Sequence, residues 1–399
     1  MRLSLSTGHD AKDLAPHTPT SMSSLTPPVT PIAKDANDPE RSIPSPLEDT
    51  VSETSASLLN YRAIDTPLRF TDDLEICHGQ DGRPVEFGRG AWSIVYKAQS
   101  AASPAGPIYT PPSSPIIPSR VFAVKAPLRR DAHQILQAEA LTLTRLNLTP
   151  GFENHVVPFY GLHSDSKALV MSPIPLALST YIEDQADLMR RGQSTTLTMF
   201  DPVQGVDSWR DMARKLISSL AWLHNTAGII HGDIKPHNIL LRCIPAEESS
   251  TEASAFPYEP LLADFSSAFD IPSDSMAKPD PSRTSMSAFT PPFTAPELLS
   301  LASLKSGDVA PTSASDVFSL AATLTAAATG DLLLYPGSSS MQRLAMARDG
   351  HQILEFTRAG LNGCRVPRKG GVEKLILPAV AKDPTRRIST QDWLVLAST

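Results

Sequence analysis

The most restrictive feature of this sequence is a polar stretch between two apolar runs, at residues 230–241. Asp233 opens its charged part, Lys235 follows two residues later, and Asn238 stands five residues after the aspartate. The next three residues are apolar again, so we expect a loop between two buried segments. Its carboxylate can accept a hydroxyl proton, its ammonium can neutralise phosphate charge, and its amide oxygen suits a hard metal ion.

This loop resembles the catalytic loop of eukaryotic protein kinases, which has the pattern H-R-D-x-K-x-x-N. Gly232 stands where the family usually has arginine. The resemblance implies that Asp233 orients the acceptor hydroxyl and takes its proton. It also implies that Lys235 steadies the migrating phosphoryl group and that Asn238 binds a metal ion.

A glycine-rich stretch upstream, residues 85–98, reads as strand, turn and strand with the pattern G-x-G-x-x-S-x-V. Glycine lets backbone N–H groups approach phosphate oxygens because it has no Cβ. Taken alone, the stretch is explained at least as well by an ordinary hairpin with a glycine turn. The resemblance implies nucleotide contacts for Gly88, Gly90, Ser93 and Val95.

An alternating β stretch ends at Lys125, and residues 132–146 then carry apolar residues close to a helical period. The stretch resembles the V-A-I-K strand of kinases, which implies that Lys125 contacts the α- and β-phosphates. Glu139 lies within the predicted helix and is implied to be the partner of Lys125. Taken singly, a lysine at a strand end or a glutamate on a helix is usually solvated.

Two short apolar runs, residues 156–160 and 168–171, are predicted to be the last strands of a small lobe. Met171 then matches the gatekeeper position of the kinase family. The hinge that would hydrogen-bond adenine follows as Ser172 to Ile174. Leu240 belongs to the implied nucleotide-binding set as well.

Further stretches downstream follow the family order. Asp264-Phe265-Ser266 resembles D-F-G, with serine for glycine, and implies that Asp264 binds magnesium. Residues 290–297 resemble the end of an activation segment, in which Thr290 would bridge the catalytic aspartate and lysine. Residues 316–320 resemble a helix of the large-lobe core, and Arg387 is implied to pair with Glu297.

Composition separates the first 60 residues from the rest of the chain. The 37 prolines of the sequence are well above the roughly 5% that is typical, and Ser/Thr-Pro pairs recur in this stretch. Such a segment cannot bury enough apolar surface to offset chain entropy, so we expect residues 1–60 to be disordered. Residues 61–399 would form one kinase domain. Its small lobe is expected at about 80–171, its large lobe at about 175–399, and insertions near 99–119, 185–205 and 243–260.

Charge and cysteine content limit the classes of partner and the compartment that we expect for this protein. A net charge of −7 indicates neither the basic surface of a nucleic-acid-binding protein nor a polybasic membrane anchor. Three well-separated cysteines favour a reducing compartment over a disulfide framework. No apolar run reaches the roughly 18 residues of a spanning helix. We therefore expect a soluble intracellular protein, cytoplasmic or nuclear, without nucleic-acid or membrane partners.

Together these patterns predict an α+β, bilobal protein-kinase-like fold, with a small β-rich lobe carrying one helix and a larger helical lobe. The expected function is that of a serine/threonine protein kinase that uses ATP and Mg²⁺ on a protein substrate. A pseudokinase scaffold stays open because of Gly232, Ser93 and Ser266. A small-molecule phosphotransferase of the aminoglycoside or choline type stays open because those enzymes also carry H-G-D. Lys235 and Thr290 disfavour a tyrosine-directed kinase.

Gly232 carries one further expectation, which concerns regulation. In kinases that are activated by phosphorylation, the arginine before the catalytic aspartate holds the phosphate. Glycine has no side chain for this. We therefore expect activity that does not depend on phosphorylation of Ser282, Thr284, Ser285 or Ser287.

Overall fold

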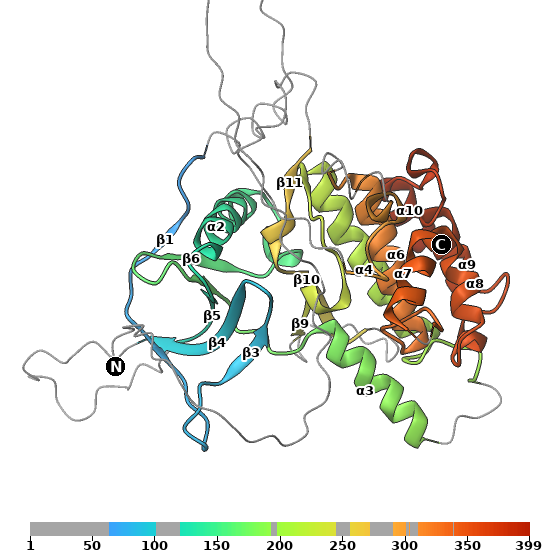
Figure 1. Cartoon of the computed structure of the whole chain (residues 1–399), viewed down its shortest axis with the longest axis horizontal. Coiled ribbons are helices and arrows are strands. Elements are labelled where there is room, and N and C mark those ends of the chain that lie inside the picture. Colours follow the sequence, from blue (N-terminus) through green and yellow to red (C-terminus); the bar gives the residue numbers. More distant parts are fainter. Residues whose placement is uncertain are drawn as a thin grey trace, which may run out of the picture.

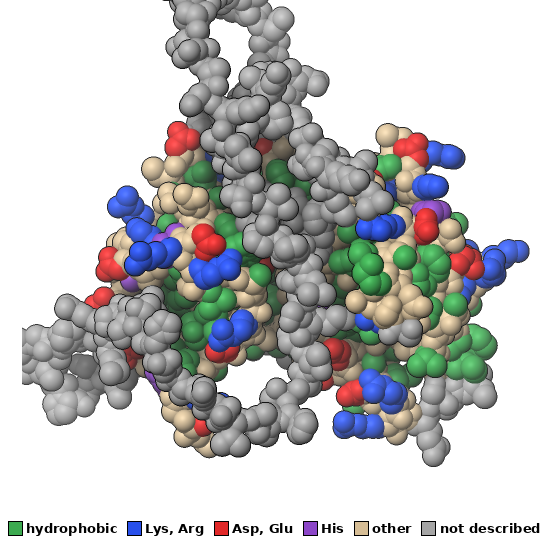
Figure 2. Space-filling model, viewed as in Figure 1, with side chains coloured by type: hydrophobic (Ala, Val, Ile, Leu, Met, Phe, Trp, Pro, Cys, Tyr) green, Lys and Arg blue, Asp and Glu red, His purple; other side chains and the backbone are tan. Residues whose placement is uncertain are grey.

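The computed structural model describes residues 64–100, 120–192, 198–244, 256–271, 290–300, 303, 310–337 and 339–399. These residues form two lobes (Figure 1), a small one built on a β-sheet with one helix and a larger one that is mainly helical. The predicted α+β bilobal architecture is confirmed. On the face shown in Figure 2, acidic and basic side chains are scattered over both lobes.

The small lobe is a curled sheet with the strand order β1-β6-β7-β5-β4-β2, and β3 pairs with β4 as a hairpin. All of its pairings are antiparallel except that of β1 with β6. The glycine turn of the β3–β4 hairpin is closed by Gly90 N–H, which donates to Ser93 O over 2.8 Å. The strands are β1 (Arg69–Phe70), β2 (Leu74–Ile76), β3 (Glu86–Arg89), β4 (Ser93–Ser100), β5 (Val121–Pro127), β6 (Phe159–His163) and β7 (Leu169–Met171).

Within the part of the small lobe that the structure describes, α2 (Ala132–Leu148) is the one α-helix. Leu136, Ala140 and Leu143 are buried and lie on one face, because residues three and four apart are neighbours on a helix. Glu139 is only 2% exposed, and a buried carboxylate needs a partner. The helix therefore brings a charged group into the interior together with its apolar face.

The large lobe surrounds helix α6 (Ser313–Thr329), whose alanine-rich, apolar sequence is buried almost throughout. Its start is stabilised by a capping box between Thr312 and Ser315. Its buried threonine hydroxyls donate to carbonyls one turn back, as Thr323 does to Ser319 O at 2.9 Å. The other helices are α3 (Leu178–Arg191), α4 (Val206–Asn225), α7 (Ser340–Arg348), α8 (Ile353–Arg358), α9 (Gly371–Ile376) and α10 (Thr390–Ala397).

Two short antiparallel ladders lie at the junction of the lobes. They pair β9 (Ile239–Cys243) with β10 (Tyr258–Leu262), and β8 (Ile229–Ile230) with β11 (Phe269–Asp270). The first ladder starts directly after the polar loop 231–238 and ends directly before the stretch that carries Asp264. The second ladder closes the other ends of the same two stretches. The loop and the Asp264 segment are therefore held side by side.

Several boundaries differ from expectation, including that of the strand expected at residues 156–160, which is observed as β6 from Phe159 to His163. The sheet begins at Arg69, before the expected small-lobe limit near residue 80, because the chain ahead of the hairpin adds the parallel edge strand β1. The span 185–205 begins inside α3, which runs to Arg191. The tail 1–60, most of the spans 99–119 and 243–260, and Ser282, Thr284, Ser285 and Ser287 lie outside the described residues.

Among the helices of the described residues, none is both long and apolar enough to cross a membrane.

Candidate active site

The polar loop is held through its backbone by a buried aspartate of helix α6. Asp316 Oδ2 accepts the His231 N–H at 2.7 Å, and its Oδ1 accepts the Gly232 N–H at 3.0 Å. His224 Nε2 lies 3.0 Å from Oδ2. Asp316 is 1% exposed, so its charge is balanced by these donors rather than by water. The sequence pattern identified the helix that Asp316 opens, but not this contact.

Asp233, Lys235, Asn238 and Thr290 converge at one point. Lys235 Nζ lies 2.7 Å from Asp233 Oδ2 and 3.1 Å from Thr290 Oγ1. Asn238 Nδ2 donates to Asp233 O at 2.9 Å and to Asp233 Oδ2 at 3.0 Å. Thr290 Oγ1 lies 3.4 Å from Asp233 Oδ1. The structure thus brings together four residues to which the sequence assigned different roles in one site.

The electrostatic setting of Asp233 suits proton transfer. Burial raises the pKa of its carboxyl above the ordinary value, although the Lys235 ammonium beside it acts in the opposite direction. A carboxylate with a raised pKa is a stronger base near neutral pH. The arrangement can therefore orient a hydroxyl group and accept its proton.

A second cluster joins β5, α2 and the segment after β10. Lys125 Nζ lies 2.7 Å from Glu139 Oε2 and 2.8 Å from Asp264 Oδ1. Phe265 N–H donates to Glu139 Oε1 at 3.2 Å. Lys125 is 5% exposed and Glu139 2%, so the lysine is enclosed between two carboxylates. The pairing expected from sequence is present, with Asp264 as an additional partner.

Burial and mutual attraction act against each other in this cluster. Burial alone would lower the pKa of Lys125, but the Asp264 and Glu139 carboxylates raise it above its usual value. Burial raises the pKa of Glu139 to about 7. Against the effect of burial, the Lys125 ammonium holds the pKa of Asp264 well below its ordinary range, helped by hydrogen bonds from Lys125 and Ser266. Asp264 is therefore the most firmly ionised carboxylate of the cluster.

Asn238 and Asp264 fit the role of oxygen ligands for a small hard cation. The Asn238 amide is oriented by the two bonds from its Nδ2, which leaves its Oδ1 as an acceptor. The Asp264 side chain is 38% exposed, so an ion can reach it. Among the described residues no group of three or more His, Cys, Asp or Glu side chains could hold a metal. A site with only these two oxygen ligands suits Mg²⁺, which takes one or two protein ligands and keeps several waters or phosphate oxygens.

The residues expected to bind nucleotide come from the β3–β4 hairpin, from β5, from β7 with the hinge after it, and from β9. Gly88, Gly90 and Ser93 are in or beside the β3–β4 turn, and Val95 is opposite Lys125 in the β4–β5 register. Val157, Ile174 and Leu261 form a small apolar cluster, and partly buried side chains pack against it at positions Met171, Leu240 and Ala263.

The hinge backbone makes local bonds in this structure. The Ser172 N–H donates to Pro158 O at 2.9 Å, and the Ile174 N–H donates to Ser172 O at 3.1 Å. The Ile174 N–H, which the sequence assigned to the adenine-binding hinge, therefore already has an acceptor within the hinge.

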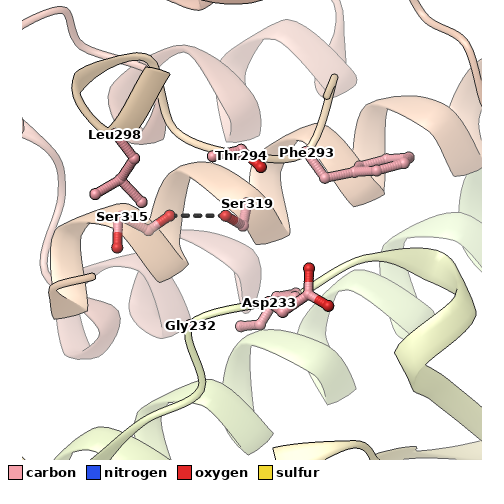
Figure 3. Close-up of a pocket in the computed structure, with 8 residues that line it drawn as sticks. Gly232, Asp233, Phe293, Thr294, Leu298, Ser315 and Ser319 are labelled. Carbon is pink, nitrogen blue, oxygen red and sulfur yellow. Dashed lines mark hydrogen bonds between the residues drawn. The ribbon is translucent and has the colours of Figure 1, made fainter. Parts of the chain in front are cut away.

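A hollow opens beside Asp233 on the side of helix α6 (Figure 3). Ser319 Oγ donates to Ser315 O at 2.9 Å along this helix. The hollow is lined by Gly232, Asp233, Ile234, Phe293, Thr294, Leu298, Ser315 and Ser319. Phe293, Thr294 and Leu298 belong to the segment that follows Thr290, so this segment borders the space next to Asp233. Its far end is anchored by Arg387, which forms a two-bond ion pair with Glu297, with both N–O distances at 2.7 Å.

Ser266 and Arg145 also make contacts that the sequence analysis did not predict. Ser266 Oγ donates to Asp264 Oδ1 at 2.7 Å. Arg145, near the end of α2, lies 3.4 Å from Asp270 Oδ2 and donates to Ile64 O at 3.2 Å. The departure from D-F-G could have drawn attention to Ser266. The contacts of Arg145 have no local signal, because they join residues far apart in the chain.

The comparisons with known proteins agree with this geometry. The family described as protein kinase domain matches residues 119–395. Serine/threonine-protein kinase ISR1 of Saccharomyces cerevisiae is 28% identical over 251 residues, which are 58% of this chain and 47% of the yeast protein. The chain thus spans about half the length of this relative. The family match starts after the glycine hairpin, which the structure nevertheless pairs with β5 in the same sheet. With the motifs, the fold and most of the chain in agreement, this chain belongs to the protein kinase family.

Proposed function

We propose that this chain is a serine/threonine protein kinase that transfers the γ-phosphoryl group of ATP with the help of Mg²⁺. The observation that carries the proposal is the contact of Thr290 with both Lys235 and Asp233, at 3.1 and 3.4 Å. This hydroxyl ties the segment beside the base to the base itself. It supports a site in which an extended protein segment presents a serine or threonine hydroxyl.

Each residue of the candidate site has a distinct part in the proposed reaction. Asp233 orients the acceptor hydroxyl and takes its proton, while Asn238 Nδ2 holds the carboxylate in place. Lys235 compensates the charge that develops on the transferred group, and Lys125 holds the phosphates of the nucleotide. Asn238 and Asp264 would hold a magnesium ion, which would supply neutralisation of the phosphate charge when bound.

The alternatives have less support. A pseudokinase scaffold was motivated by Gly232, Ser93 and Ser266, yet the groups that would bind metal and transfer the proton are all present. A small-molecule phosphotransferase has no need of the segment from Thr290 to Glu297. That segment is bonded to the catalytic loop at one end and to Arg387 at the other.

The test is phosphorylation of a peptide array that carries serine, threonine and tyrosine acceptors, with Mg²⁺ and ATP. Wild type should label serine and threonine peptides, and Asp233→Asn should not. Asp73→Asn, at an exposed aspartate, is the matched control and should keep full activity. A thermal shift with ADP and Mg²⁺ is measured in parallel. Absence of both the shift and peptide labelling in wild type would support the scaffold instead.

A further inference from the structure

The serine that replaces the glycine of the D-F-G motif makes a direct contact with the candidate metal ligand. Ser266 Oγ donates to Asp264 Oδ1 at 2.7 Å, and Lys125 Nζ donates to the same oxygen at 2.8 Å. Among the described residues, Asp264 Oδ2 accepts no hydrogen bond. The carboxylate is thus held by one oxygen, and its other oxygen stays available as an acceptor.

The backbone explains why a serine fits here. Asp264 has a positive φ of 63°, a conformation that aspartate tolerates better than most residues. Ser266 lies in the short turn η3 (Phe265–Ser267) and is not among the described residues with positive φ. A side chain at this position therefore costs no backbone strain, and its hydroxyl reaches back two residues to the carboxylate.

The turn η3 fits against the catalytic loop because the loop has a glycine, Gly232, at the point of contact. Gly232 has a φ of +80°, and a Cβ there would overlap the carbonyl oxygen of Ser267 and lie 3.2 Å from its carbonyl carbon. The turn that presents Ser266 thus packs directly on Gly232. The two departures from the family pattern, at positions 232 and 266, occur in segments that touch each other.

We propose that Ser266 is a positioning residue for the metal-binding carboxylate of Asp264. Its hydroxyl holds Oδ1 and thereby keeps Oδ2 available to Mg²⁺, a fixed orientation that the family's glycine cannot provide. A hydrogen bond to an ionised acceptor is short and stronger than one between neutral groups. The inference rests on the proposed function, since it concerns the metal site of that reaction.

The experiment measures how much Mg²⁺ is needed for ADP binding, by calorimetric titration of ADP at a series of Mg²⁺ concentrations. Ser266→Ala should raise the half-saturating Mg²⁺ concentration roughly 10- to 150-fold, the loss expected for one hydrogen bond to a charged group. ADP affinity in EDTA should stay unchanged. Ser266→Thr keeps a hydroxyl and should restore most of the Mg²⁺ response. Ser266→Gly introduces the residue of the family pattern and also removes the hydroxyl. It replaces the alanine variant in the experiment if that variant fails to fold.

The matched control is Ser389→Ala. Ser389 Oγ donates to Asp392 Oδ2 at 2.7 Å, so the same kind of bond is removed at an exposed helix start far along the chain. Its Mg²⁺ response should equal that of wild type. Equal Mg²⁺ requirements for wild type, Ser266→Ala and Ser266→Gly would overturn the inference and leave the proposed function intact. A wild type that binds no ADP at any Mg²⁺ concentration would instead refute the metal site of the proposed function.

Discussion

The two halves of the candidate active site are built in different ways. The catalytic loop gathers Asp233, Lys235 and Asn238 from within six consecutive residues, and its backbone is held by one aspartate of α6. The Lys125 cluster instead takes one charge from each of three elements, with Lys125 and Asp264 separated by 139 residues. The first half depends on local conformation. The second depends on the placement of α2 and of the two lobes. A shift between them would therefore change the distances among its buried charges.

The largest expected effect lies in the catalytic loop. Asp233→Asn removes the base but keeps the size of the side chain, so kcat should fall roughly 10²- to 10⁴-fold. ADP affinity should stay close to that of wild type, because the Lys125 cluster is untouched. Steady-state kinetics and calorimetry measure the two quantities. A parallel loss of ADP affinity would mean that the two halves are not separable.

The Lys125 cluster should respond as a unit. Lys125→Met leaves Glu139 without its ammonium partner, and Glu139→Gln weakens the hold on Lys125, so either change disturbs the same ion pair. In a double-mutant cycle on kcat/KM we expect a coupling of about 1–3 kcal/mol between the two positions. The cycle of Lys125→Met with Asp233→Asn provides the comparison across the two halves. Additive losses for Lys125 and Glu139 would remove Glu139 as the functional partner.

The contact between the halves can be tested at Gly232. Gly232→Ala must adopt a positive φ and also push against Ser267, so we expect a destabilisation of about 2–4 kcal/mol. Gly82→Ala is the matched control, because Gly82 also has a positive φ of 73° but open space around it. It should cost only about 1 kcal/mol. Chemical denaturation measures both, and equal losses would show that the Ser267 contact does not matter.

Gly232→Arg restores the residue of the family pattern and tests the same contact from the functional side. It should lower activity rather than raise it, because the arginine Cβ meets the same obstacle as alanine. A gain of activity in a peptide assay would mean that the missing arginine, and not the packing on Ser267, is what distinguishes this loop.

The smallest effects are expected at the N-terminus. Deletion of residues 1–55 should leave the melting temperature unchanged. Deletion of residues 1–70 removes β1, the Leu68 N–H bond to Thr144 Oγ1 at 2.8 Å and the Ile64 contact of Arg145. It should lower the melting temperature by several degrees, because these contacts support α2 from outside. Equal melting temperatures for the two truncations would show that α2 is held by the lobe alone.

The local half of the site was readable from the sequence. The spacing of Asp233, Lys235 and Asn238 determines which groups share one loop, and the apolar runs on both sides determine that the loop is anchored. The apolar period of residues 132–146 likewise predicted helix α2. Local patterns carry this information because the interacting residues are also neighbours in the chain.

Tertiary structure decided how the segments of both halves are held against one another. No sequence pattern near Asp316 indicates that it accepts two backbone N–H groups of the catalytic loop, because these groups lie more than 80 residues away. The same holds for Arg145 with Asp270. Gly232 looked like the loss of an arginine, and only the packing of Ser267 against it reveals a position that has no room for a Cβ. Excluded volume and buried charge act between segments brought together by folding, so their consequences are absent from any single stretch of sequence.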